Sequence, residues 1–287
     1  MRATSPDPFG ERFGHPRCSP GGEQIADYVH GLGEPVKHEA GAALSPYLSV
    51  MDVYDRSAHA YDLIQAARGR DYSAQADHLV AMISARCPSA NSLLDVACGT
   101  GLHLASLRRH FTELAGVDLS RAMLRRARDA LGDVPLELGD MRSFQLSRRF
   151  DVVVCLFSSI GYLLTLDDVR AAVANMADHV DAGGLLIVEP WIHPDRWRLG
   201  HRVAEAANAD GLAVSRVSVN GREGHVSTFD LYWTIASDRG VDQFTERHRM
   251  GLYSPEEYID AFRGANLTVE HEGTGLIGRG MFIGQRK

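Results

Sequence analysis

The sequence predicts a doubly wound α/β fold, in which helices cover both faces of a parallel sheet. From about residue 92, short apolar runs alternate with segments whose apolar residues recur every three or four positions. The runs are apolar throughout, as expected for strands that are buried on both faces of a parallel sheet. A chain of 287 residues is long enough for one such domain with an added subdomain.

The elements of this fold follow in order along the chain. Apolar and aromatic residues at helical spacing predict short helices over 54–65 and a longer helix over 72–86, which Pro88 ends. The alternation then predicts strands over 92–97, 114–118, 136–138, 151–157 and 184–189. The intervening helices are predicted over 102–110, 121–131 and 166–180.

The pattern changes after Pro190. β segments joined by glycine-containing turns predict an antiparallel insert after the fifth strand, over 216–220, 226–235 and 244–250. Ser254, followed by a proline and two glutamates, predicts the N-cap of a helix that runs to about Gly264. Segments 267–270 and 281–283 can then close the main sheet.

These boundaries divide the chain into parts. Residues 1–45 carry several prolines and no periodic apolar pattern, which predicts a flexible leader. The core is expected over 46–190, the antiparallel insert over 191–250, and the closing helix and strands over 251–287.

Composition excludes several classes of function. A net charge of −7 and a pI near 6.0 argue against attraction of the whole protein to nucleic acid. No apolar run approaches the roughly 20 residues needed to cross a bilayer, and the N-terminal residues lack the apolar core of a secretory signal, so a cytoplasmic protein is expected. The cysteines form no C-x-x-C pair or metal-binding cluster and are interpreted as reduced thiols, with no metal expected: Cys18, Cys87, Cys98 and Cys155.

The sharpest motif is Asp-Val-Ala-Cys-Gly-Thr-Gly at residues 95–101, between a predicted strand and a predicted helix. Gly99 and Gly101 let the backbone turn sharply and pass close to a ligand. A dinucleotide-binding loop would have a third glycine where Leu104 stands, so a nicotinamide oxidoreductase is not favoured. The carboxylate of Asp95 suits a cationic ligand, such as an aminoacyl sulfonium. The alternative is a purely structural role, in which the glycine turn only packs a helix on a strand.

Two further acids follow at the ends of the next strands. Asp118 ends the second strand, where a carboxylate can accept the ribose hydroxyls of a nucleoside. Asp140 follows the third strand and is placed to accept the exocyclic amine of adenine. Because the carboxyl ends of parallel strands meet at one edge of a sheet, Asp95, Asp118 and Asp140 are predicted to form one site.

The arrangement resembles the class I S-adenosylmethionine-dependent methyltransferases, whose core is a Rossmann-like sheet. Further motifs resemble the N-methyltransferases of nucleotide-activated amino sugars: Tyr61-Asp62, Gly69-Arg-Asp-Tyr72, Gly139-Asp-Met-Arg142, Phe157-Ser-Ser-Ile-Gly-Tyr162, Val188-Glu-Pro-Trp191, Ser215-Arg-Val-Ser218, Arg222-Glu-Gly224 and Gly278-Arg-Gly-Met-Phe282. The resemblance implies S-adenosylmethionine as cofactor and N-methylation, once or twice, of a dTDP-linked amino-deoxyhexose in antibiotic sugar biosynthesis. It also implies a homodimer.

The resemblance carries roles to particular residues. Residues expected to border the cofactor are Tyr61, Tyr72, Asp95, Ala97, Gly99, Gly101, Asp118, Asp140, Met141 and Leu156. Tyr54 and Tyr162 would face the amine of the sugar, and Arg279 would pair with the diphosphate. Further candidates for the substrate are Arg216, Arg222 and Trp191. Some relatives have other residues at the positions of Tyr162, Ile192 and Val219, and Tyr54 lies one residue closer to Tyr61 than in relatives, so the sugar pocket is expected to differ.

Methyl transfer requires a neutral amine aligned with the sulfonium methyl, and no dedicated general base is assigned because the proton can leave to water before attack. Two alternatives stay open. The acceptor can be another small amine or hydroxyl compound, or the chain can be a protein that binds the cofactor without chemistry.

Overall fold

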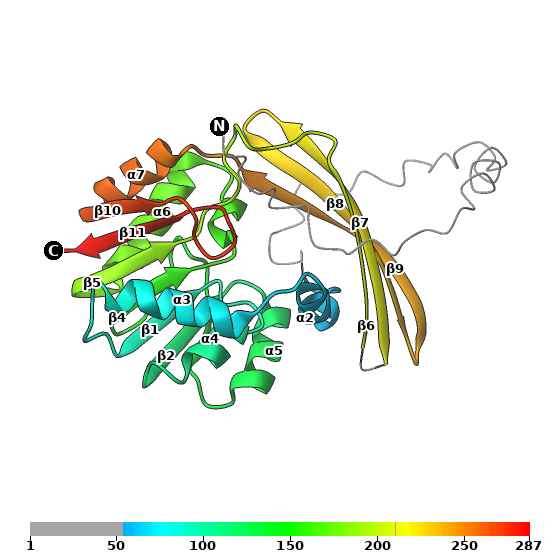
Figure 1. The fold of residues 1–287 in the computed structure, drawn as a ribbon, viewed down its shortest axis with the longest axis horizontal. Helices are drawn as coiled ribbons and strands as arrows, with labels where there is room; N and C mark the ends of the chain where they lie inside the picture. Colours follow the sequence, from blue (N-terminus) through cyan, green and yellow to red (C-terminus); the bar gives the residue numbers. More distant parts are fainter. Residues whose placement is uncertain (1–53, 210) are drawn as a thin grey trace, which may run out of the picture. The chain divides into compact units, whose positions relative to one another are not determined.

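The computed structural model describes residues 54–209 and 211–287, so the expected leader over 1–45 and Cys18 lie outside the described residues. Two sheets organise these residues, as Figure 1 shows. Sheet A has seven strands in the order β10-β11-β5-β4-β1-β2-β3, and sheet B has four in the order β6-β7-β8-β9. The predicted α/β fold with an antiparallel insert is confirmed.

Sheet A is parallel except at one edge. Its strands are β1 (Ser92–Val96), β2 (Glu113–Asp118), β3 (Leu136–Leu138), β4 (Phe150–Cys155), β5 (Val180–Val188), β10 (Leu267–Glu272) and β11 (Met281–Arg286). Strand β11 pairs antiparallel with β5, and β10 pairs antiparallel with β11, so the last strands close the sheet as predicted. The chain leaves β1 toward β2 and β3 and then returns to β4 on the other side of β1. Such a reversal of strand order opens a ligand-binding crevice at the carboxyl ends of the two strands.

Both faces of sheet A are buried, which explains why its strands are apolar throughout. Leu185 and Ile187 of β5 pack in a cluster with α3 (Tyr72–Ser84), α4 (Leu102–Leu107) and α5 (Arg121–Leu131). The next residues along the strand, Leu186 and Val188, pack in a second cluster with α6 (Leu166–Asp178) and α7 (Pro255–Gly264).

Helices begin at the predicted residues where a capping side chain marks the N-terminus. Ser254 caps α7, as its sequence predicts, and Glu257 completes a capping box with it. Three helices end earlier than predicted: α3 stops at Ser84, α4 at Leu107 and α6 at Asp178. His179 accounts for the early end of α6, because its Nδ1 contacts the carbonyl oxygen of Asn175 at 2.7 Å and the chain turns directly into β5.

Sheet B is longer than the sequence predicts. It comprises β6 (Arg202–Ala209), β7 (Leu212–Glu223), β8 (Val226–Ser237) and β9 (Gly240–Gly251). The sequence analysis missed β6, because alanine and asparagine have low strand propensity and four of its residues are alanine. Pairing with β7 along its whole length holds this strand.

One face of sheet B packs against α2 (Ala58–Ala67), where Ala60 and Ile64 meet Val214, Leu231 and Trp233. The opposite face carries exposed apolar side chains: Val217 and Val219 on β7 and Tyr232 on β8.

Cys98 and Cys155 are buried free thiols, and Cys87 is half-buried. Among residues 54–209 and 211–287, no helix is long and apolar enough to span a membrane, and no group of histidine, cysteine and acidic side chains could hold a metal.

Candidate active site

The loop after β1 is shaped by residues with positive φ. Ala97, Gly99 and Gly101 have φ of 63°, 57° and 79°. A Cβ at Gly101 would lie 2.6 Å from Cδ1 of Leu131, so this glycine permits close packing of α4 on α5. A Cβ at Gly99 would meet nothing within 4 Å, because Gly99 faces a cavity.

The cavity has a volume of about 440 Å³ and lies at the carboxyl ends of β1, β2 and β4. It brings together most of the predicted site residues: Tyr54, Tyr61, Tyr72, Asp95, Ala97, Gly99, Asp118, Asp140, Met141, Leu156 and Tyr162. Its lining also includes residues to which sequence analysis assigned no role: Thr100, His103, Met123, Arg142, Phe157 and Asp168. Five predicted residues are not part of the lining: Gly101, Trp191, Arg216, Arg222 and Arg279.

Two buried acids face the cavity in different environments. The carboxylate of Asp118 accepts backbone N–H hydrogen bonds from Gly99 and Ser120, both at 2.8 Å. Burial raises the pKa of Asp118, and these N–H donors oppose the rise. Asp95 is 2% exposed, and its pKa is raised well above the usual value by burial and by repulsion from Asp118. Two carboxylates in this position favour a ligand that carries positive charge.

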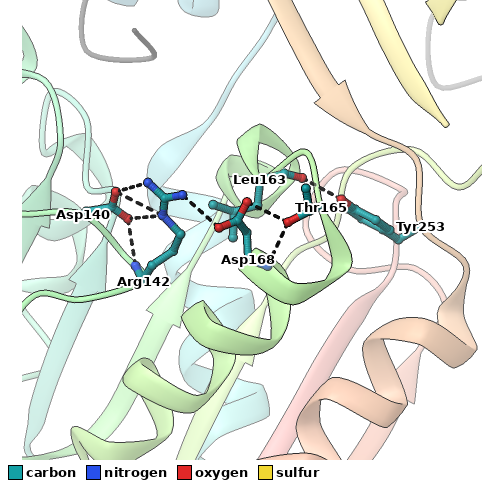
Figure 2. Close-up of polar contacts among 6 residues, drawn as sticks. All are labelled: Asp140, Arg142, Leu163, Thr165, Asp168 and Tyr253. Carbon is teal, nitrogen blue, oxygen red and sulfur yellow. Dashed lines mark hydrogen bonds and ion pairs between the residues drawn. The ribbon is translucent and has the colours of Figure 1, made fainter. Parts of the chain in front are cut away.

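Asp140 is held at the cavity rim by an arginine clamp, drawn in Figure 2. Arg142 donates to both carboxylate oxygens of Asp140, at 2.6 Å from Nη2, and reaches Asp168 at 2.9 Å from Nη1. Thr165 donates to Asp168 at 2.7 Å and so ties the clamp to the start of α6. The guanidinium of Arg142 lowers the pKa of Asp140, which therefore stays an ionised acceptor. Tyr253 bonds to the carbonyl oxygen of Leu163 in the same view.

A cluster of aromatic residues, Tyr54, Tyr61 and Tyr162, also lines the cavity. The hydroxyl groups of Tyr54 and Tyr162 lie 2.5 Å apart, and Tyr162 also contacts Nδ1 of His248 at 2.8 Å. The ring of Tyr61 meets that of Tyr54 edge to face at 5.6 Å. Burial raises the pKa of all three tyrosines, so their hydroxyl groups stay protonated.

Sequence analysis missed His248. Its signal was the two-residue alternation of β9, which places Glu246 and His248 on the same face as the apolar Phe244 and Met250. Polar residues on the buried face of a strand are unusual and indicate a specific role.

Glu189, at the end of β5, organises the loops beside this cluster. Its buried carboxylate accepts backbone N–H groups from Phe157 at 2.9 Å and from Leu276 and Ile277 at 3.1 Å. Phe157 and Ser158 have φ of 54° and 64°, which is uncommon for residues with a side chain. The three hydrogen bonds hold this strained loop against the segment that precedes Arg279.

Arg279 is a half-buried cation. Its Nη1 donates to Ser158 Oγ at 2.6 Å, and its guanidinium lies 4.3 Å from the ring centre of Trp191. Burial lowers the pKa of Arg279 to about 9; the charge of Glu189 opposes the fall, and that of Arg70 adds to it. The side chain is still cationic at neutral pH, and an anionic ligand would offset the cost of removing its charge from water.

The other two predicted arginines have different surroundings. Arg216 is buried, bonds to Glu205 and lies 5.0 Å from the ring centre of Trp233. Arg222 is exposed, and its Nε donates to the carbonyl oxygen of Gly224 at 2.7 Å.

Residues 93–184 match the family described as methyltransferase domain. Over 79% of its length, the chain is 43% identical to a dTDP-3-amino-3,4,6-trideoxy-alpha-D-glucopyranose N,N-dimethyltransferase of Streptomyces venezuelae, 96% of which is covered. The chain belongs to the dTDP-amino-sugar N,N-dimethyltransferase family. The methyltransferase is also 39% identical, over 79% of its length, to a dTDP-4-amino-2,3,4,6-tetradeoxy-D-glucose N,N-dimethyltransferase of Saccharopolyspora spinosa, 91% of which is covered.

Among solved structures, the methyltransferase resembles CalS10, an amino pentose methyltransferase from Micromonospora echinaspora, with S-adenosylmethionine bound. The identity is 34%, the TM-score is 0.73, and the match covers 86% of this chain and all of CalS10. S-adenosylmethionine is the cofactor of this methyltransferase. The cavity fits that cofactor, because open space at Gly99 admits a ligand against the backbone and the buried acids Asp95 and Asp118 favour its positive charge.

Proposed function

We propose that this methyltransferase N,N-dimethylates, in two rounds, the amine of a dTDP-linked amino-deoxyhexose in antibiotic sugar biosynthesis. The observation that carries the proposal is the half-buried cation of Arg279, which donates to Ser158 next to the segment that carries Tyr162. Its partner Ser158 immediately precedes the 3₁₀ helix Ser159–Tyr162, which presents Tyr162. The relatives named above, which act on dTDP-amino sugars, support the same acceptor.

In this proposal the strand-end acids hold the cofactor. Asp118 accepts the ribose hydroxyls, Asp140 accepts the adenine amine, and Asp95 faces the cationic aminoacyl end. Side chains that border the cofactor are Tyr61, Tyr72, Met141 and Leu156, while Ala97 and Gly99 allow close backbone approach. Gly101 contributes indirectly, because it lets α4 pack against α5. When bound, the cofactor supplies an electrophilic methyl group on a sulfonium.

Tyr54 and Tyr162 orient the acceptor. Both residues line the cavity and their hydroxyl groups stay protonated, so the phenol oxygens can accept N–H groups of an amine and direct its lone pair toward the methyl. The main contribution to rate is alignment of two bound reactants in a water-poor cavity. The amine loses its proton to water before it reacts.

Arg279 recognises the diphosphate. A guanidinium binds phosphate oxygens bidentately, and the ring of Trp191 stacked on it fixes the plane of the Arg279 guanidinium. Pairing with the diphosphate also offsets the desolvation that lowers the pKa of Arg279. Arg216 and Arg222 stay further candidates for the nucleotide.

We also propose a cytoplasmic homodimer. The exposed side chains of Val217, Val219 and Tyr232 form an apolar strip on the outward face of sheet B, which a second copy can cover. The free thiols of Cys87, Cys98 and Cys155 suit a reducing compartment.

Mass spectrometry tests the reaction. Purified protein is incubated with S-adenosylmethionine and a panel of dTDP-linked 3-amino and 4-amino 6-deoxyhexoses. We expect one regioisomer to gain two methyl groups. Arg279→Gln should raise KM for the nucleotide sugar about 10- to 100-fold, because a charge-assisted bond contributes about 1.5–3 kcal/mol. Arg263→Gln, at an exposed position on α7 with no assigned role, is the matched control and should leave KM unchanged. If no nucleotide sugar is methylated while the cofactor binds, the acceptor is another small amine or hydroxyl compound.

A further inference from the structure

Sheet B brings two buried polar side chains to the tyrosine pair. His248 and Glu246 lie on β9 and are 2% and 7% exposed. Nδ1 of His248 contacts the hydroxyl group of Tyr162 at 2.8 Å, and Tyr162 in turn contacts Tyr54 at 2.5 Å. A continuous chain of polar groups therefore leads from the cavity into sheet B.

The far side of His248 faces a carboxylate. Among the described residues, Nε2 of His248 has no hydrogen-bond partner, and it lies 3.8 Å from Oε2 of Glu246. That oxygen accepts the indole N–H of Trp233 at 2.9 Å, which fixes the carboxylate. Phe229 stacks on the imidazole with ring centres 5.0 Å apart and fixes its plane.

The imidazole of His248 is neutral at neutral pH, since burial lowers its pKa. Glu246 and Asp230 oppose that fall, and Arg216 adds to it. A neutral imidazole carries one N–H, on either ring nitrogen. A bare Nε2 lone pair would be repelled by the carboxylate of Glu246, whereas an Nε2–H group is attracted to it, so the proton resides on Nε2.

The Nε2 tautomer of His248 sets the direction of both hydrogen bonds that link His248, Tyr162 and Tyr54. Nδ1 is then the acceptor and takes the O–H of Tyr162. The only proton of Tyr162 is used, so Tyr54 must donate its own O–H to the oxygen of Tyr162. The free lone pairs remain at the cavity end, on Tyr54 and Tyr162.

We propose that Glu246 and His248 are positioning residues that make the tyrosine pair an acceptor for the substrate amine. The proposal rests on the proposed function. An amine N–H can donate to a phenol oxygen while the nitrogen lone pair points to the methyl group. In the opposite direction of the chain, a phenol O–H would donate to that lone pair and block the nucleophile.

The tautomer is read directly by ¹⁵N NMR of the full chain labelled at histidine, with cofactor bound. His248→Phe assigns the signal, and His248→Asn replaces it for this purpose if the phenylalanine variant does not fold. We expect the proton of His248 on Nε2 in the wild type and loss of this preference in Glu246→Gln. A wild-type proton on Nδ1 overturns the proposal, whether or not any variant folds.

Kinetics test the consequence. Glu246→Gln keeps an oxygen for Trp233 but loses the charge, so kcat should fall about 10- to 100-fold, while the Kd for S-adenosylhomocysteine changes less than about twofold. Asp230→Asn removes a charge that also acts on His248 but does not face Nε2, and it should leave kcat unchanged. An unchanged kcat in Glu246→Gln overturns the proposal. Absence of wild-type turnover on every amino sugar would refute the proposed function instead, and the NMR result would still decide the tautomer.

Discussion

Replacing Asp118 by Asn should destabilise the cofactor-free enzyme, whereas the same replacement at Asp95 should not. The two side chains are both buried carboxylates that face one cavity, and they differ in their hydrogen bonds. Asp118 accepts backbone N–H groups from Gly99 and Ser120, one on each oxygen. An amide has only one oxygen, so its NH₂ group would face one of the two N–H donors.

The loss at Asp118 can be estimated from these bonds. A hydrogen bond to a charged group contributes about 1.5–3 kcal/mol, and removal of a buried charge offsets part of it. A net loss of about 1–2 kcal/mol lowers Tm by roughly 2–8 °C in a protein of this size. The effect on the cofactor should be larger, about 10- to 100-fold in Kd, if Asp118 also binds the ribose.

The expected effect of Asp95→Asn on stability has the opposite sign. Burial and repulsion from Asp118 both raise the folded-state pKa of Asp95, whereas backbone N–H donors oppose the rise at Asp118, so in the window above about pH 4 the folded protein keeps a proton on Asp95 that the unfolded chain has lost. Stability therefore falls as pH rises through that window and stays reduced above the folded pKa. Asp95→Asn removes this effect and should raise Tm at pH 7 by roughly 2–4 °C, or about 1 kcal/mol, with a smaller gain at lower pH.

Thermal unfolding monitored by fluorescence, with and without S-adenosylmethionine and at several pH values, measures both effects. Calorimetric titration supplies the cofactor Kd, which should rise in both variants. A fall in the cofactor-free Tm of Asp95→Asn as large as that of Asp118→Asn would refute the reasoning, because Asp95 would then support the fold rather than the ligand.

Two further predictions concern packing and assembly. Gly101→Ala should lose about 2 kcal/mol or more of stability, because its Cβ would meet Leu131. Gly99→Ala should lose only about 1 kcal/mol and should mainly weaken cofactor binding. Thermal unfolding measures the first effect and calorimetric titration the second. Tyr232→Arg should convert the proposed dimer to a monomer in sedimentation velocity, while Asp260→Arg on α7 should not. A dimer that persists in Tyr232→Arg contradicts the proposed face.

The part of the cavity proposed for the cofactor could be predicted because it depends on local order along the chain. Asp95 lies near the end of β1, Asp118 ends β2 and Asp140 follows β3, and parallel pairing brings the ends of such strands to one edge whatever the rest of the chain does. The cap at Ser254 was predictable for the same reason, since a capping box is local.

The part of the site proposed for the acceptor was decided by tertiary structure. Pairing of β8 with β9 sets which residues of β9 face Tyr162, and a register one residue different would turn His248 outward. Arg279 owes its position to Glu189, whose carboxylate holds the preceding segment from 87 residues away along the chain. The succession of strands along the chain and the acids at their ends depend on neighbouring residues. Burial, register and the direction of a series of hydrogen bonds arise only when distant segments exclude water together.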